Sequence, residues 1–158
     1  MQRGGRAVVV GDDIDTDIIF PARYLAVLDP VDQATHLFEP YGPEFRGRIV
    51  AGRVITAGWN FGCGSSREHA VTAMIGAEVQ LVIAKSFSRI FYRNAINTGL
   101  AVVIAPDLAA AIADGDAVEA DLAAGTAAAA GRPFSFAPLA PELLRILSAG
   151  GLWAARAA

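Results

Sequence analysis

Three glycines, two serines and an arginine gather in one short stretch of the chain, GWNFGCGSSREHA at residues 58–70. Glycine lets a backbone approach a ligand closely and adopt positive φ angles. An amphipathic pattern begins at the serines, so the stretch is predicted to lead into a helix N-terminus, where free N–H groups and the dipole favour anions. Arg67 adds a guanidinium that suits a carboxylate. The stretch predicts an anion pocket that contains a serine hydroxyl as nucleophile or base.

A purely structural interpretation of the same stretch stands beside this one. Ser65 and Glu68 have the spacing of a helix capping box, in which the serine would only cap the helix. Other glycine-rich motifs do not fit. The stretch has no Gly-Lys-Ser/Thr for a P-loop, Arg67 stands where a dinucleotide fingerprint needs its third glycine, and neither serine has a glycine two residues later, as a nucleophile elbow requires.

Composition indicates a globular protein and excludes several classes of partner. The 158 residues are 54% hydrophobic and 18% charged, so we expect a single domain that spans residues 1–158 and has a sizeable core. The net charge of −3 argues against a nucleic-acid partner, and no apolar stretch approaches the length of a membrane span. Because Cys63 is the one cysteine, no internal disulfide can form, the chain alone cannot hold an iron–sulfur cluster, and a cytoplasmic location is predicted.

Apolar runs alternate with helical patterns through the middle of the chain, which predicts an α/β layer. Strands are expected at 7–10, 54–57, 79–84 and 100–105, and helices at 66–75 and 87–98. After residue 117 the alternation of apolar and acidic residues predicts a β-ribbon that includes the alanine run, and Pro141 opens a C-terminal helix. The Pro- and Gly-rich residues 29–47 are expected to form a long excursion over the surface, with helical stretches possible near residues 31–38.

Three further residue patterns have ready structural explanations. Aspartates alternate in GDDIDTD as in a calcium loop, but Ile18 and Tyr24 occupy the positions where such a loop needs glycine and glutamate, so calcium is not expected. His69 follows Ser65 at i+4 and could form a Ser–His pair, but packing is the favoured interpretation because helical side chains lean toward the N-terminus. Cys63 is expected to be a small buried filler.

Three blocks of the chain carry a resemblance to a known family. They are GDDIDTDIIFPARYL, AGWNFGCGSSREHA and IAKSFSRIFYRNAINTGL, and the ending PELLRILSAGGL fits as well. With these blocks the chain resembles the small subunits of the 3-isopropylmalate dehydratase (isopropylmalate isomerase) family, in its compact, archaeal-type branch. That family is homologous to the swivelling C-terminal domain of aconitase. The resemblance implies an α/β fold of the swivelling β/β/α three-layer type.

The resemblance also implies roles for single residues. Ser65 matches the serine that removes the Cα proton in aconitase-like enzymes, and Ser66 and Arg67 match positions that bind substrate carboxylates. Gly62 and Gly64 would support the loop. Asp17 matches an aspartate near the active site, and a local loop-capping role is an equal alternative for it.

A division of labour between two subunits is implied as well. A large partner subunit, in a heterodimer or heterotetramer with this chain, would carry a [4Fe–4S] cluster with one open iron that acts as a Lewis acid on a small dicarboxylate substrate. This chain would bind no metal itself. The expected activity is that of a hydro-lyase in leucine biosynthesis.

The segment Tyr24–Val27 is expected to choose the substrate, because in this family the loop after the Tyr-Leu pair reads the γ-substituent. Homoaconitase-like members have an arginine there, whereas this chain has Leu25, Ala26 and Val27. Burial of about three apolar carbons is worth roughly 2 kcal/mol, which favours an isopropyl group over a third carboxylate. Arg23 weakens the inference, and methylmalate (citraconate), dimethylmalate and homoaconitate enzymes remain open alternatives.

A stand-alone binding module for carboxylates is the alternative from another functional class. It would keep Ser65, Ser66 and Arg67 but would not copurify with a cluster-bearing partner.

Overall fold

The structure is a computed structural model that describes residues 1–157. Its elements follow one another in an order that mixes strands and helices. They are β1 (Gln2–Val9), α1 (Thr16–Ile19), η1 (Ala22–Tyr24), α2 (Pro30–Ala34), η2 (Glu39–Tyr41), α3 (Gly42–Arg46), β2 (Val54–Ala57), α4 (Glu68–Gly76), β3 (Leu81–Ala84), α5 (Arg89–Thr98), β4 (Val102–Ile104), α6 (Pro106–Ala111), β5 (Ala117–Asp121), β6 (Thr126–Ala129), β7 (Arg132–Ser135), α7 (Pro141–Ala149) and α8 (Leu152–Ala157).

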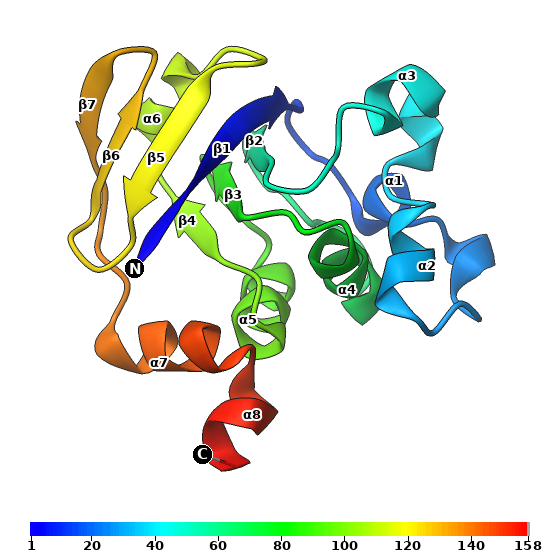
Figure 1. The fold of residues 1–158 in the computed structure, drawn as a ribbon. Coiled ribbons are helices and arrows are strands. Elements are labelled where there is room, and N and C mark those ends of the chain that lie inside the picture. Colours follow the sequence, from blue (N-terminus) through cyan, green and yellow to red (C-terminus); the bar gives the residue numbers. More distant parts are fainter. Residues whose placement is uncertain (158) are drawn as a thin grey trace.

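The strands form one seven-stranded sheet in the order β4-β3-β2-β1-β5-β6-β7 (Figure 1). The strands from β4 to β1 run parallel, and those from β1 to β7 pair antiparallel. Strands β2 and β3 are buried along their whole length, as is typical of parallel strands between helices. The predicted α/β fold is confirmed.

Strand β1 joins the two halves of the sheet because it changes partners along its length. Residues 2–6 pair antiparallel with β5, and residues 7–9 pair parallel with β2. The sequence predicted only residues 7–10 as a strand. The polar stretch QRGGR before them has no apolar pattern, and only the ladder with β5 makes it a strand.

The predicted β-ribbon is present as β5, β6 and β7 at one side of the sheet (Figure 1). The alanine run becomes β6 because Ala127 and Ala129 face the core while their neighbours are exposed. The turn to β7 consists of Ala130 and Gly131, whose φ angles are 51° and 71°. Two positive φ angles in a two-residue hairpin turn match the twist of the strands.

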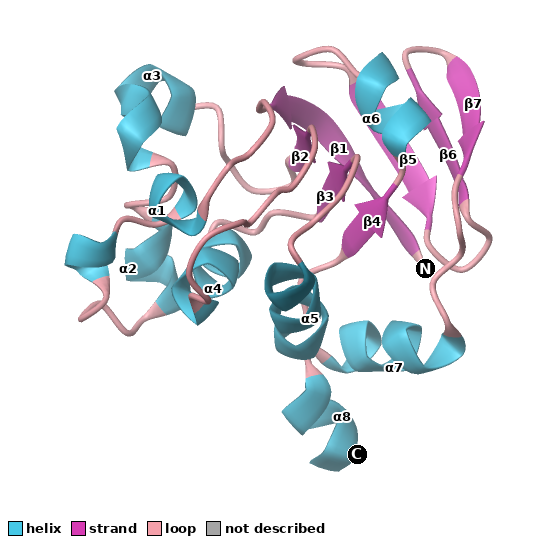
Figure 2. Ribbon diagram, turned by 180° about the vertical axis from the view of Figure 1, so that it is seen from behind, coloured by secondary structure: helices cyan, strands magenta, loops and turns pink. Residues whose placement is uncertain are grey.

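Seen from behind, the helices α4, α5 and α7 lie below the strands, while α6 lies beside the ribbon (Figure 2). Helix α5 ends as predicted at Gly99, whose φ angle of 99° is the left-handed C-cap conformation. The sequence did not predict α1, α3, α6 or α8.

The excursion at residues 29–47 is more than a surface loop. It contains α2, η2 and α3, and helix α2 packs against α4. Leu37 and Phe38 are almost completely buried in the main core, so this segment contributes to the core and does not only cover it. A helix near residues 31–38 was expected, and α2 lies there in part. The expectation that the segment runs over the surface is wrong at Leu37 and Phe38, because the Pro- and Gly-rich composition gave no sign of these two buried side chains.

Candidate active site

The glycine-rich loop between β2 and α4 packs against the segment that follows β1. This segment, residues 11–17 with the sequence GDDIDTD, is called the acidic segment below. The backbone N–H of Gly62 donates to the carbonyl of Ile14 at 2.8 Å, and the N–H of Thr16 donates to the carbonyl of Cys63 at 3.0 Å. The two segments are far apart in the sequence and run side by side here. The loop therefore owes its place to the acidic segment as well as to its own glycines.

Gly62 and Gly64 are required for different reasons. Both have φ angles in the left-handed region, 78° and 89°. A Cβ at position 62 would also lie 2.3 Å from the ring of Phe91 on α5, so any side chain there would displace the helix. A Cβ at position 64 would meet only ordinary contacts, so the requirement there is conformational.

Ser65 does not cap the helix that follows it. Helix α4 begins at Glu68, its N-cap is Arg67, and no side chain caps it. The capping-box interpretation of Ser65 and Glu68 is therefore wrong, and the helix begins two residues later than predicted. Ser65 and Ser66 are both exposed in the turn before the helix. Neither hydroxyl forms a capping hydrogen bond to the N-terminus of α4.

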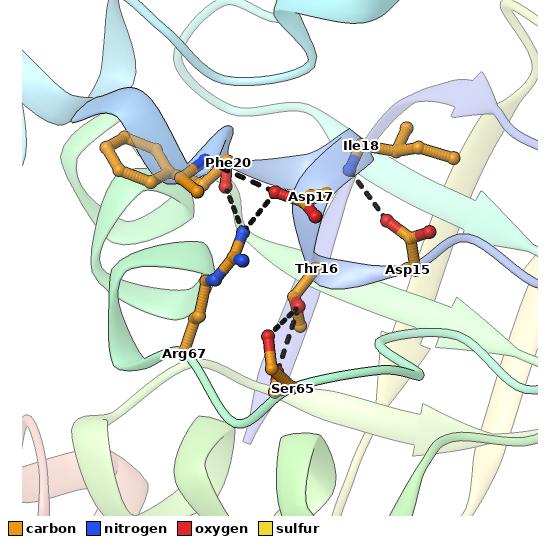
Figure 3. A network of polar contacts seen from close by, with 8 residues as sticks. Asp15, Thr16, Asp17, Ile18, Phe20, Ser65 and Arg67 are labelled. Carbon is orange, nitrogen blue, oxygen red and sulfur yellow. Dashed lines mark hydrogen bonds and ion pairs between the residues drawn. The ribbon is translucent and has the colours of Figure 1, made fainter. Parts of the chain in front are cut away.

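Arg67 points toward the acidic segment (Figure 3). Its Nη1 donates to Asp17 at 2.5 Å and to the carbonyl of Phe20 at 3.3 Å. The Arg67 side chain is 15% exposed and that of Asp17 is 60% exposed. The hydrogen bond from Arg67 lowers the pKa of Asp17, desolvation opposes it, and the N–H of Ala22 lowers it further. Asp17 thus accepts from the N–H of Ala22, as the loop-capping alternative expects, and it also pairs with Arg67.

A small cavity beside the serines has a volume of about 10 Å³, which is roughly the space that one water molecule needs. Its wall unites the glycine loop with α1 and α5, and it consists of Thr16, Gly62, Gly64, Ser65, Ser66, Arg67, Ile90, Phe91 and Asn94. The Asn94 amide lies 3.4 Å from the Ser66 hydroxyl, and the Ile90 side chain is half exposed. This arrangement places two hydroxyls and a cation around one position at the surface, where they can donate to an anionic group that approaches from outside.

Four residues of this wall were not predicted from the sequence. They are Thr16, Ile90, Phe91 and Asn94. Ile90, Phe91 and Asn94 stand in a block that carried the family resemblance, which was the available signal. Their residue types and spacing alone did not indicate that α5 faces the loop.

The segment Tyr24–Val27, which was expected to read the substrate, is next to contacts with His36 and Glu39. Tyr24 stacks on His36 with ring centroids 3.6 Å apart, and the Arg23 guanidinium lies 4.8 Å from the Tyr24 centroid. Arg23 also forms an ion pair with Glu39. Burial lowers the pKa of His36, and the charges of Arg46 and Arg23 lower it further, so the imidazole is neutral at pH 7.

Leu25 and Ala26 are exposed and Val27 is half-buried. None of the residues 24–27 belongs to the wall of the cavity beside Ser65. The structure therefore brings the Ser65–Arg67 triplet together with Asp17 and both loop glycines, but does not bring the substrate-reading segment into contact with it.

The remaining polar residues near the loop have structural contacts. His69 stacks on Phe20 with centroids 5.5 Å apart, as the packing interpretation expects. Cys63 is half-buried, so it is less buried than the expected buried filler. Burial raises the pKa of the Cys63 thiol, and the carboxylates of Asp15 and Asp13 raise it further.

Within residues 1–157, no three His, Cys, Asp or Glu side chains are placed so that they could hold a metal ion. Over the same residues, no helix combines the length and the apolar character that crossing a bilayer requires.

Known proteins resemble this chain in both sequence and structure. Residues 46–107 match the aconitase C-terminal domain family. The 3-isopropylmalate dehydratase small subunit 1 of Methanopyrus kandleri is 49% identical over 150 residues, which cover 94% of this chain and 88% of the relative. The chain belongs to the 3-isopropylmalate dehydratase small subunit family. The predicted family, and with it the predicted class of dehydratase subunit, is confirmed.

Two further comparisons are with a relative that is named for another substrate and with a solved structure. The 2,3-dimethylmalate dehydratase small subunit of Eubacterium barkeri is 44% identical over 154 residues, which cover 96% of this chain and 94% of the relative. A crystal structure of 3-isopropylmalate dehydratase from Methanocaldococcus jannaschii superposes with a TM-score of 0.92 at 43% identity, covering 99% of this chain and 94% of that chain. The swivelling-domain fold that the sequence predicted is therefore present here.

Proposed function

We propose that this chain is the small subunit of a cytoplasmic 3-isopropylmalate dehydratase, a hydro-lyase that interconverts 2-isopropylmalate and 3-isopropylmalate by dehydration and rehydration. The observation that carries the proposal is the cavity that unites Ser65, Ser66 and Arg67 in a chain of this family. A large subunit, in a heterodimer or heterotetramer, is the proposed partner.

Ser65 is the proposed base that removes the Cα proton. Its hydroxyl is exposed and does not cap α4, so it is free to meet a substrate. A serine hydroxyl has a very high intrinsic pKa and needs support when it loses its proton. The N-terminus of α4 and the charge of Arg67 provide positive potential in the same turn.

Arg67 is the proposed carboxylate-binding residue, with Ser66 beside it. Within residues 1–157 only Nη1 of Arg67 has partners, so Nη2 and Nε are left to donate to a substrate carboxylate. Asp17 holds the guanidinium from one side and thereby fixes the direction in which the remaining N–H groups point.

The proposed cofactor is a [4Fe–4S] cluster on the large subunit, because this chain has a single cysteine and a cluster is held by several thiolates. The cluster would supply Lewis-acid activation of the substrate hydroxyl. The residues of this chain would bind the carboxylate, move the Cα proton and close the site against water.

Two structural points support an alkyl-substituted malate. The segment Tyr24–Val27 carries no cation of its own, and the charge of the preceding Arg23 is paired with Glu39. In a complex whose large subunit covers this exposed segment and brings it to the substrate, a third substrate carboxylate would be buried without a partner, at a cost that exceeds the gain from apolar contacts. These points favour 3-isopropylmalate over homoaconitate.

2,3-Dimethylmalate is the second candidate substrate. A relative with that name matches 96% of this chain at 44% identity, and the same apolar segment would accept methyl groups.

The test is reconstitution of the chain with a cluster-loaded large subunit from the same source. Turnover of (2R,3S)-3-isopropylmalate, 2,3-dimethylmalate, citraconate and homoaconitate is then compared by kcat/KM. We expect 3-isopropylmalate to be preferred and the chain alone to be inactive. A preference for homoaconitate would refute the proposed substrate, and failure to associate with any cluster-bearing chain would favour a stand-alone binding module.

A further inference from the structure

Thr16 of the acidic segment contacts Ser65, the proposed base, and the proposed mechanism gives this contact no role. Thr16, the first residue of α1, is 3% exposed, and its hydroxyl reaches across to Ser65 (Figure 3). Thr16 Oγ1 donates to the backbone carbonyl of Ser65 at 2.9 Å and lies 3.5 Å from the Ser65 hydroxyl. A buried side chain therefore meets both the main chain and the reactive group of one exposed residue.

The direction of the second contact follows from the number of protons. A threonine hydroxyl has one proton and two lone pairs. Because Thr16 gives its proton to the Ser65 carbonyl, only Ser65 can donate in the 3.5 Å contact. Thr16 thus anchors the Ser65 main chain and also accepts the Ser65 hydroxyl in the state without substrate.

Ser65 has little else to hold it. It follows Gly64, a glycine with a φ angle of 89°, and glycine restricts its backbone little. It also lies before α4, which begins at Glu68. Within residues 1–157, the Ser65 carbonyl accepts no hydrogen bond other than the one from Thr16. Thr16 itself is well fixed, because Asp15 caps α1 and the Thr16 N–H is bonded to the loop.

We propose that Thr16 is a positioning residue that holds Ser65 where it can act on the substrate. This inference rests on the proposed function, in which Ser65 is the base. A base that is misplaced by about 1 Å can cost about a hundredfold in rate. Substrate binding depends on Ser66 and Arg67, so the loss of Thr16's hydroxyl should act on kcat much more than on KM.

The decisive variants are Thr16→Val, which removes the hydroxyl at similar volume, and Thr16→Ser, which keeps it. In the complex with the large subunit we expect Thr16→Val to lower kcat about 10-fold to 100-fold and to change KM less than about threefold. Thr16→Ser should recover most of the lost kcat. Thr56→Val is the matched control, since Thr56 is 1% exposed and its hydroxyl has no partner within residues 1–157.

A second readout does not depend on activity. Cys63 is the only thiol of the chain and lies two residues from Ser65, so its rate of labelling by a thiol reagent reports on the loop. In the full-length chain we expect Thr16→Val to be labelled several times faster than the wild type. Thr16→Ser and Thr56→Val should be labelled at close to the wild-type rate, because they leave the anchor intact.

Each outcome supports or overturns the role of Thr16. If Thr16→Val keeps its kcat, or if Thr16→Ser is as slow as Thr16→Val, the hydroxyl does not position Ser65 and the inference is wrong. A lowered melting temperature with unchanged kcat would also overturn it, since the role would be structural only.

The proposed function fails separately from this inference. If the wild-type complex prefers 2,3-dimethylmalate, the substrate assignment is wrong and Thr16 is judged by kcat on that substrate. If the wild type turns over none of the malates, the labelling rates decide, and equal rates for Thr16→Val and the wild type overturn the anchor.

Discussion

Replacement of Ser65 by alanine separates chemistry from structure at this site. The structure predicts a small effect on stability, because the Ser65 side chain is exposed, caps no helix, and has one contact at 3.5 Å to Thr16. Surface substitutions of this kind change stability by less than about 0.5 kcal/mol. For a chain of this size, that corresponds to a change in melting temperature of at most about 2 °C.

The expected effect on turnover is much larger. Loss of a positioned general base costs about 10²-fold to 10⁴-fold, which corresponds to roughly 3–5 kcal/mol of transition-state stabilisation. The anchor on the Ser65 backbone carbonyl survives in Ser65→Ala, so the loop should keep its shape. We therefore expect kcat to fall by at least about a hundredfold with KM nearly unchanged.

The assay combines initial rates of the reconstituted complex with thermal unfolding of the chain. Ser66→Ala is the comparison variant, because a residue that binds the carboxylate should raise KM more than it lowers kcat. A Ser65→Ala enzyme with kcat within tenfold of the wild type would refute the role as base. A melting temperature lowered by several degrees would show that the side chain has a structural role that the geometry does not reveal.

Three further predictions follow from the charges around the loop. Arg67→Lys should raise KM and lower kcat in steady-state kinetics, because a planar fork with several N–H donors becomes a point charge, and unchanged constants would rule out the carboxylate clamp. Ala26→Arg should lower kcat/KM for 3-isopropylmalate and raise it for homoaconitate, by factors of about ten or more, because the segment Tyr24–Val27 is proposed to reach the substrate in the complex. Equal effects on both substrates would refute the proposed role of this segment in substrate choice. The labelling rate of Cys63 should keep rising above pH 9.0, since burial and the charges of Asp15 and Asp13 raise the pKa of its thiol and only the thiolate reacts, and a plateau below pH 9.0 would contradict this.

The central strands and helices could be predicted because local signals were complete there. Apolar runs define β2 and β3, and Gly99 ends α5 with a left-handed φ angle. The first half of β1 could not be predicted in this way, since its polar residues become a strand only through the ladder with β5. The capping box failed for a related reason, because the spacing of Ser65 and Glu68 fits a cap that the loop geometry does not use.

Only part of the candidate site could be predicted from the sequence. The serine–arginine triplet has a local pattern, so its residues could be named. The contact of Thr16 with Ser65 joins positions that are 49 residues apart and depends on the parallel course of two irregular segments. Asn94 similarly reaches Ser66 from another helix. No local pattern predicts such pairs, since tertiary packing alone makes them neighbours.

The acidic segment and the glycine-rich loop are joined by several contacts into one structural unit. Asp17 holds the guanidinium of Arg67, and Thr16, its neighbour, holds the main chain of Ser65. The pKa of Asp17 is lowered chiefly by the hydrogen bond from Arg67, so the carboxylate stays ionised at neutral pH and the pair persists. One short helix thereby contacts both the proposed carboxylate-binding residue and the proposed base.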